Sequence, residues 1–162
     1  MNGKLRNMTS IYLRRGEKFL LLYRMGSKVI GNSYTGTAGG HFESEELNDA
    51  RACVLRELKE ETGLLETDIE GLTMRYVTLR LKNGEIRQNY YFFATLAEHV
   101  NEVQSNEGEL QWFDVSEIEA LPMPHSAKYM ILHYLRVGQY TECLYGGATV
   151  EDDVIFTELK EF

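Results

Sequence analysis

The sequence predicts an α/β protein, because stretches with strand patterns and stretches with helix patterns follow one another along the chain. A near-continuous apolar run at 19–24 is typical of a strand buried on both faces, and hence of a central position in a sheet. Residues 72–97 form two alternating stretches around Asn83-Gly84, the strongest short-range signal for a hairpin. Between these strands, residues 48–63 have the capping residues and the apolar stripe of a helix.

Length and charge limit the classes of function. A chain of 162 residues is long enough for one domain with a substantial core, so a single domain over 1–162 is expected. Its net charge of −8 argues against a nucleic-acid polymer as partner, since binding a phosphate backbone requires a basic surface. A small anionic substrate fits such a chain if metal ions supply positive charge locally.

Cysteine content and hydropathy indicate a cytoplasmic protein with no membrane association. Cys53 and Cys143 have no C-x-x-C spacing and form no disulfide framework. Cys53 falls within the predicted helix, where a small buried apolar residue is the simplest interpretation. The first residues contain no apolar signal region, and no apolar run approaches the length of a membrane span.

The N-terminal third is expected to be a pair of strands followed by a glycine-rich loop. Strands are predicted at 8–14 and 19–24, the second ending at Arg24. Residues 25–40 contain five glycines and are loop-rich, with a short strand expected at 33–37. Glycine permits close approach of the backbone to a ligand, although glycine content alone is weak support for a site.

The central helix has recognisable ends. We expect it to begin near Asn48, a good N-cap, with Asp49 favourable at the positive end of the helix dipole. Gly63 is a natural residue to end it. Inside it, an apolar stripe is expected to pack on the sheet, formed by Val54, Leu55 and Leu58.

Glu57, Glu60 and Glu61 share one face of this helix, since they are separated by three or four residues or are adjacent. Like charges at that spacing repel by about a few tenths of a kcal/mol per pair. A hard divalent cation, bound by the carboxylate oxygens, would offset the repulsion. The alternative is a solvated acidic face, which is common on surface helices.

The C-terminal half contains further strands and a last helix. Tyr90 to Phe93 are more simply explained as core packing than as a base-stacking surface. A polar loop at 98–109 precedes a Trp-Phe strand, and a short helix capped by Ser116 is expected after it. Ser126 is predicted to cap a final helix through Val137. Strands at 143–145 and 154–159 are expected to end the chain, with Gly146-Gly147 as a turn.

The stretch from Gly39 to Leu64 resembles the Nudix box of the Nudix hydrolases, commonly written G-x5-E-x7-R-E-U-x-E-E-x-G-U with U aliphatic. Residues 56–64 match every specified position of its second half. Gly40 and Glu46 fit the first half, but nine residues rather than seven separate Glu46 from Arg56.

The two additional residues lie in the loop before the helix. Asn48 stands where the strict count would put the first glutamate, so Glu46 is a candidate for that position. Within the family, the chain most resembles the MutT-type members. It implies a Nudix fold in which a mixed sheet is sandwiched between helices (α/β/α), with a core over 6–137. Residues 138–162 would then be an additional strand pair that covers the site, extends the sheet or forms a homodimer contact.

The resemblance also implies roles for individual residues. Metal ligands for Mg²⁺ or Mn²⁺ would be Glu57, Glu60 and Glu61 with the Gly39 carbonyl and Glu107. Either Glu57 or Glu107 would accept the proton of the attacking water; Glu109 is the second choice for the loop carboxylate. Substrate contacts are assigned to Arg24, Met123 and His125. Structural roles within the box are assigned to Gly40, Glu46, Arg56 and Gly63.

Three functions follow from these assignments. The first is a pyrophosphohydrolase that converts a nucleoside triphosphate to monophosphate and pyrophosphate, with oxidised purine nucleotides such as 8-oxo-dGTP among its candidate substrates. The second is hydrolysis of ADP-ribose, nucleotide sugars or dinucleoside polyphosphates. The third is a non-catalytic nucleotide-binding module, which the presence of all three helix glutamates disfavours.

Overall fold

A computed structural model describes residues 3–25 and 32–161 of the chain. Its strands and helices, in chain order, are β1 (Lys4–Arg15), β2 (Lys18–Arg24), β3 (Ser33–Thr35), α1 (Ala50–Thr62), β4 (Ile69–Lys82), β5 (Glu85–Leu96), β6 (Glu109–Asp114), α2 (His125–Arg136), β7 (Leu144–Val150) and β8 (Asp153–Leu159). Short 3₁₀ helices occupy Ser44–Glu46, Glu66–Asp68, Ile118–Ala120 and Gly138–Tyr140.

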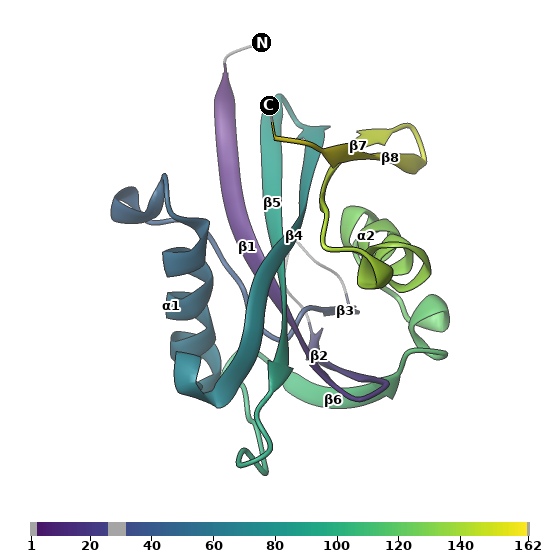
Figure 1. The fold of residues 1–162 in the computed structure, drawn as a ribbon. Coiled ribbons are helices and arrows are strands. Elements are labelled where there is room, and N and C mark those ends of the chain that lie inside the picture. Colours follow the sequence, from purple (N-terminus) through teal and green to yellow (C-terminus); the bar gives the residue numbers. More distant parts are fainter. Residues whose placement is uncertain (1–2, 26–31, 162) are drawn as a thin grey trace.

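The described strands form one mixed sheet with α1 and α2 on opposite faces, which confirms the predicted α/β/α architecture (Figure 1). The strand order is β3-β2-β1-β5-β4-β7-β8, and β6 pairs with β2. β1 runs parallel to β5 and antiparallel to β2. β2 therefore lies inside the sheet, as its apolar sequence predicts, and its residues 19–22 are buried.

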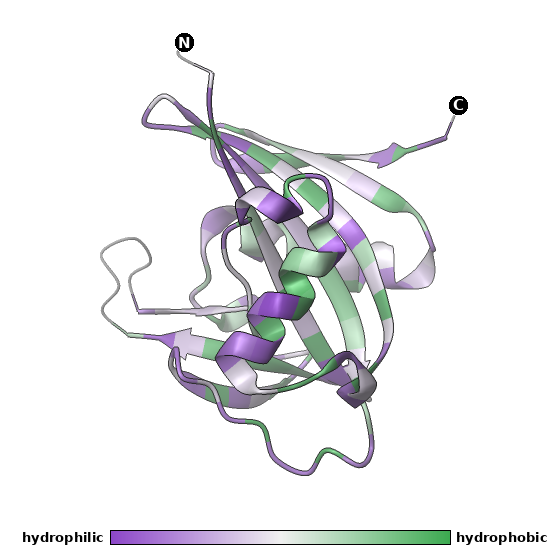
Figure 2. Ribbon diagram, turned by 90° about the vertical axis from the view of Figure 1, so that its left-hand side faces the viewer, coloured by the Kyte–Doolittle hydropathy of each residue, from purple (hydrophilic) through white to green (hydrophobic). Residues whose placement is uncertain are grey.

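The core between α1 and the sheet is aliphatic. Val54 and Leu58 of α1 are fully buried there, and Leu55 is partly buried. Cys53 is buried as expected, with its Sγ atom 3.3 Å from the Thr9 hydroxyl. Hydrophilic and hydrophobic residues both occur along α1 (Figure 2), because one side of the helix is solvated while the other packs on the strands.

The core between α2 and the sheet is aromatic. Phe93 stacks on Tyr134 of α2 with ring centroids 3.8 Å apart, and Tyr12 and Tyr76 are fully buried beside them. Tyr91 also packs here, whereas Phe92 packs on the α1 side. The alternation along β5 therefore confirms that these aromatic residues are core residues.

Three predicted boundaries are wrong. Asp49, not Asn48, caps α1, because its side chain accepts from the Ala52 N–H at 2.9 Å. Ser116 caps nothing: the 3₁₀ helix begins at Ile118 with no side-chain cap. Ser126 lies inside α2, which begins at His125 after Pro124. Its hydroxyl is buried 3.3 Å from that of Thr149. The side chain therefore makes a tertiary contact with β7 instead of capping the helix.

The C-terminal strand pair is confirmed, and it extends the sheet by pairing parallel to β4. Gly146 and Gly147 do not form the turn, however, because they lie inside β7. Glu151, with a φ of 52°, is in the turn between β7 and β8 instead. A Cβ on Gly147 would press on the Phe156 ring, so this glycine serves strand packing.

None of the helices in the described part of the chain has the length and apolar composition needed to cross a membrane.

Candidate active site

The last turn of α1 and the loop before β6 both contact the end of β2. Arg24 Nη2 lies 3.2 Å from Glu61 Oε1 and 3.9 Å from Glu107 Oε2. Asn106 ties the loop to the helix, since its backbone N–H donates to the Glu61 carbonyl and its side chain to the Glu60 carbonyl. The structure thus brings together Arg24, Glu61 and Glu107, which are distant in the sequence.

The Gly39-Gly40 segment runs antiparallel beside β1 at close range. Thr9 N–H donates to the Gly40 carbonyl at 2.8 Å, and a Cβ on Gly39 would overlap the Thr9 carbonyl oxygen. Gly39 N–H donates to Glu61 Oε2 at 3.1 Å. A Cβ on Gly40 would overlap the Glu57 carboxylate. Two glycines therefore let the carboxylates of Glu57 and Glu61 lie against the main chain.

Glu61 is the most perturbed carboxylate of this group. Its burial raises the pKa to about 7, and the negative charges of Glu57 and Glu107 act in the same direction. The Gly39 N–H and Arg24 partly offset this effect. A buried carboxylate with other carboxylates nearby is typical of functional sites and favours a bound cation.

Arg56 connects the loop before α1 with the helix. It donates to both carboxylate oxygens of Glu46, at 2.6 and 2.9 Å, and to the His41 carbonyl at 3.0 Å. Its Nη1 also donates to Glu57 at 2.9 Å and to Glu60 at 3.0 Å. Glu46 is therefore buried and paired to Arg56, whereas the side chain of Glu60 is 57% exposed.

The donor chemistry of this site fits a hard divalent cation. Within residues 3–25 and 32–161, no three acidic, histidine or cysteine side chains are grouped closely enough to hold a metal ion as they stand. Gly39 and Gly40 nevertheless let the Glu57 and Glu61 carboxylates approach one stretch of backbone, so oxygen donors of the kind that Mg²⁺ prefers gather at one place. Turning Glu57 and Glu60 away from Arg56 would add their oxygens.

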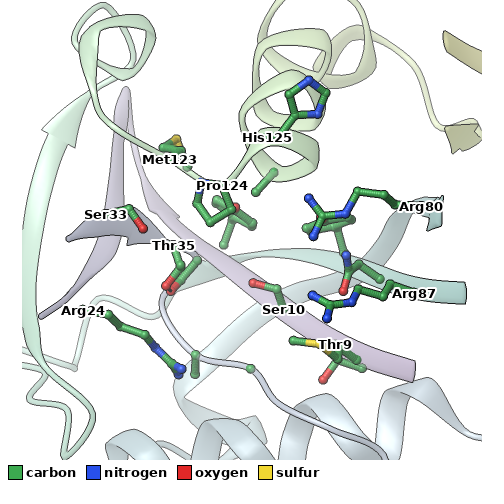
Figure 3. Close-up of a pocket in the computed structure, with 18 of the residues that line it drawn as sticks. Thr9, Ser10, Arg24, Ser33, Thr35, Arg80, Arg87, Met123, Pro124 and His125 are labelled. Carbon is green, nitrogen blue, oxygen red and sulfur yellow. Dashed lines mark hydrogen bonds between the residues drawn. The ribbon is translucent and has the colours of Figure 1, made fainter. Parts of the chain in front are cut away.

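A cavity of about 710 Å³ opens beside Arg24 on the α2 side of the sheet (Figure 3). Its volume is in the range of small-molecule sites. Met123 and His125, both predicted as substrate contacts, line it together with Pro124. Lys128 of α2 fixes the chain just before these residues, because its ammonium group donates to the carbonyls of Ile118 and Leu121.

The remaining predicted residues lie outside the cavity. Gly63 ends α1 with a φ of 76° and donates to the Lys59 carbonyl, as a helix stop should. Glu109, the second choice for a loop carboxylate, is exposed at the start of β6. Glu107 has 48% of its side chain exposed.

A basic group at the far end of the cavity was not predicted from the sequence. Arg6, Arg80, Lys82 and Arg87 all line it. Arg80 and Lys82 are two residues apart in β4, a spacing that places both on one face of a sheet and could have signalled part of this group.

Comparisons with known proteins point to one family. The family model for the NUDIX domain matches residues 4–134. A relative in Bacillus subtilis (strain 168), described as the uncharacterized Nudix hydrolase YvcI, is 31% identical over 141 residues. That alignment covers 83% of this chain and 82% of the relative.

Solved structures share the fold at lower identity. The MutT protein from Bacillus halodurans superposes with a TM-score of 0.67 at 22% identity, covering 94% of this chain and 97% of that one. An Ap4A hydrolase from C. elegans gives 0.64 at 16% identity, covering 85% and 99% of the two chains.

Proposed function

Because the chain belongs to the Nudix hydrolase family, we propose that it hydrolyses a phosphoanhydride bond of a nucleoside triphosphate, giving nucleoside monophosphate and pyrophosphate. The observation that carries this proposal is the position of Arg24. It lines a nucleotide-sized cavity and also contacts Glu61 and Glu107, so a phosphate-binding cation and metal-binding carboxylates meet at the cavity's edge. The family match to hydrolases leaves no support for the non-catalytic alternative.

Glu57, Glu60 and Glu61 are proposed to hold Mg²⁺ or Mn²⁺, with Glu107 and the Gly39 carbonyl as further oxygen donors. The ion would supply the positive charge that neutralises the phosphate oxygens and makes a nearby water more acidic. A bound ion would give the negative charge of Glu61 a partner and would disfavour the protonated form of this carboxylate.

The chain's own residues do the rest. Arg24 orients the substrate phosphates, since its guanidinium is fixed between Glu61 and Glu107 and offers several donors. Either Glu57 or Glu107 accepts the proton of the attacking water. Arg56 is a positioning residue, because it holds Glu57 and the loop carrying Glu46. Met123 and His125 form the wall against which the nucleoside packs.

The far end of the cavity favours a second candidate. The cavity continues from Arg24 to Arg80 and Arg87 on the opposite side, which leaves room for a group beyond the nucleoside (Figure 3). Substrates of the general form nucleoside diphosphate linked to another group, such as ADP-ribose, nucleotide sugars or dinucleoside polyphosphates, would use that space.

A panel of nucleotides incubated with Mg²⁺ separates the two candidates. The panel contains the common dNTPs, 8-oxo-dGTP, ADP-ribose and a dinucleoside polyphosphate. Pyrophosphate release from triphosphates supports the first candidate. Cleavage restricted to the linked diphosphates supports the second, and no cleavage by the wild type would contradict both. The Glu61→Gln variant is the control for contaminating phosphatases.

A further inference from the structure

Three arginines lie side by side across the sheet. In the strand register, Arg6 of β1 pairs with Arg87 of β5, and Arg80 of β4 pairs with the same Arg87. Residues paired in this way point to one face and have Cβ atoms about 5 Å apart, and like charges placed so destabilise a sheet. We call these three residues the arginine row.

The arginine row faces the α2 side of the sheet. Tyr12, Tyr76 and Tyr91 belong to the core on that side, and the arginines lie at even spacings from them along the same strands. All three arginines line the cavity, as does Lys82. Figure 3 shows Arg80 and Arg87 reaching into the cavity from one side and Arg24 from the other.

The positive charge of the row is only partly compensated. Glu85 lies 3.1 Å from Arg87 and 3.9 Å from Arg6, and it also pairs with Lys4 at 3.8 Å. Arg80 has no carboxylate partner among the described residues, and its buried Nε has no hydrogen-bond partner there either. Burial and the neighbouring Arg87 lower the pKa of Arg80.

The three neighbouring guanidinium groups repel one another, although the chain as a whole has a net charge of −8. Guanidinium groups that face a cavity and are only partly compensated would be stabilised by an anionic ligand. A phosphate monoester suits the row best, because its terminal oxygens can accept several guanidinium hydrogen bonds at once.

The row is separated from the candidate hydrolytic site by a defined span. The Gly39-Gly40 segment is hydrogen-bonded to β1 at Thr9, three residues from Arg6. That distance is about 10 Å along a strand. A phosphate held at Arg24 would therefore lie apart from the row, and the two ends of the cavity offer two separate positions for anionic groups.

We propose that the substrate is a nucleotide with a second phosphate group, attached away from the scissile phosphoanhydride and bound by Arg6, Arg80 and Arg87. This inference rests on the proposed function, because it places the scissile diphosphate at Arg24 and the box glutamates. It narrows the substrate class from nucleotides in general to nucleotides phosphorylated at two positions.

Matched substrate pairs test the proposal. The members of each pair differ by one ribose phosphate: ATP and its 3′-phosphate, GTP and its 3′-phosphate, NAD and NADP, dephospho-coenzyme A and coenzyme A. We expect at least one doubly phosphorylated member to be cleaved with a kcat/KM about tenfold or more above that of its twin, mainly through a lower KM. Equal kcat/KM values within every pair would overturn the proposal.

Variants connect the preference to the row. In Arg80→Gln and Arg87→Gln, the ratio of kcat/KM within the preferred pair should fall toward one. Arg51→Gln is the matched control, because Arg51 is an exposed arginine of α1, on the other face of the sheet, paired with Glu66. It should keep the wild-type ratio. If either row variant fails to fold by circular dichroism, Arg6→Gln and the exposed Lys82→Gln replace it.

A binding measurement decides the proposal independently of turnover. Adenosine and guanosine 3′,5′-bisphosphates contain no phosphoanhydride bond, so calorimetry with wild-type protein in EDTA reports binding alone. At least one bisphosphate should bind about tenfold more tightly than the corresponding 5′-monophosphate. Equal affinities would refute the arginine row as a phosphate site, whereas tight binding without hydrolysis of any nucleotide would refute only the proposed function.

Discussion

Arg56 donates from Nε and Nη2 to the two carboxylate oxygens of Glu46, at 2.6 and 2.9 Å. This pair joins the loop before α1 to the helix. Because Glu46 rather than Asn48 is paired to Arg56, the two additional residues of the box lie between Glu46 and the start of α1.

Replacing Glu46 should therefore destabilise the fold. Glu46→Gln removes charge-assisted hydrogen bonds to Arg56, and we expect the free energy of unfolding to fall by about 2 kcal/mol. Urea unfolding measures this free energy. Glu66→Gln, at the exposed ion pair with Arg51, is the control and should change the free energy by less than about 1 kcal/mol. Equal effects of the two substitutions would contradict the structural role of Glu46.

The same pair should make stability depend on pH. The hydrogen bonds from Arg56 lower the pKa of Glu46 from 4.5 to about 2. Since the folded pKa lies below the unfolded one, the contribution is fully present above about pH 4.5 and is lost as pH falls toward 2. The difference in unfolding free energy between wild type and Glu46→Gln should therefore shrink over that interval. A difference that stays constant from pH 6 to about pH 3 would contradict this assignment.

The two box glycines should respond differently to alanine. In Gly40→Ala the new Cβ meets the end of the Glu57 side chain, which can move, so activity should fall about tenfold or more while stability changes little. In Gly39→Ala the Cβ meets the Thr9 backbone, and the free energy of unfolding should fall by at least about 2 kcal/mol. Thermal unfolding and initial rates, measured on both variants, test the contrast. A larger loss of stability in Gly40→Ala than in Gly39→Ala would contradict this prediction.

Removing the charge of Glu61 should lower the activity of the protein without lowering its stability. Glu61→Gln eliminates a buried carboxylate whose pKa of about 7 reflects unfavourable burial of its charge. In EDTA at pH 8, the variant should melt at the same temperature as the wild type or higher, because no buried charge remains. With Mg²⁺, turnover should fall by about two orders of magnitude or more. Glu70→Gln, on an exposed site of β4, is the control. Near-normal turnover in Glu61→Gln would contradict its role as a metal ligand.

Magnesium should stabilise the protein through the same carboxylate. A ligand that binds only the folded state raises its melting temperature. We expect the wild type to melt at a higher temperature with Mg²⁺ than in EDTA, and Glu61→Gln to lose most of that increase. An equal increase in both proteins would place the ion elsewhere.

Local patterns predicted much of the fold. The apolar run of β2, the Asn83-Gly84 hairpin and the stop at Gly63 depend on neighbouring residues, and all three are confirmed. The predicted caps at Ser116 and Ser126 were wrong, and for Ser126 a tertiary contact outweighed the local preference. Ser126 is buried against Thr149 from a strand 23 residues later.

The site was predictable only where one segment supplies it. Glu57, Glu60 and Glu61 follow from spacing on one helix, whereas their contacts with Gly39, Gly40 and Arg24 require the tertiary fold. The arginine row was missed for the same reason. Arg80 and Arg87 become neighbours through the antiparallel pairing of β4 with β5, and Arg6 joins them only through the parallel pairing of β1 with β5.

The central claim is that the carboxylates beside Arg24 support metal-dependent cleavage of a phosphoanhydride in a nucleotide. The most direct test follows the ³¹P spectrum of nucleoside triphosphates incubated with wild-type protein and Mg²⁺, in parallel with Glu61→Gln. The account predicts that pyrophosphate and nucleoside monophosphate appear together with the wild type, disappear with EDTA, and form far more slowly with the variant. Intact triphosphate in every wild-type sample, or equal cleavage by Glu61→Gln, would contradict it.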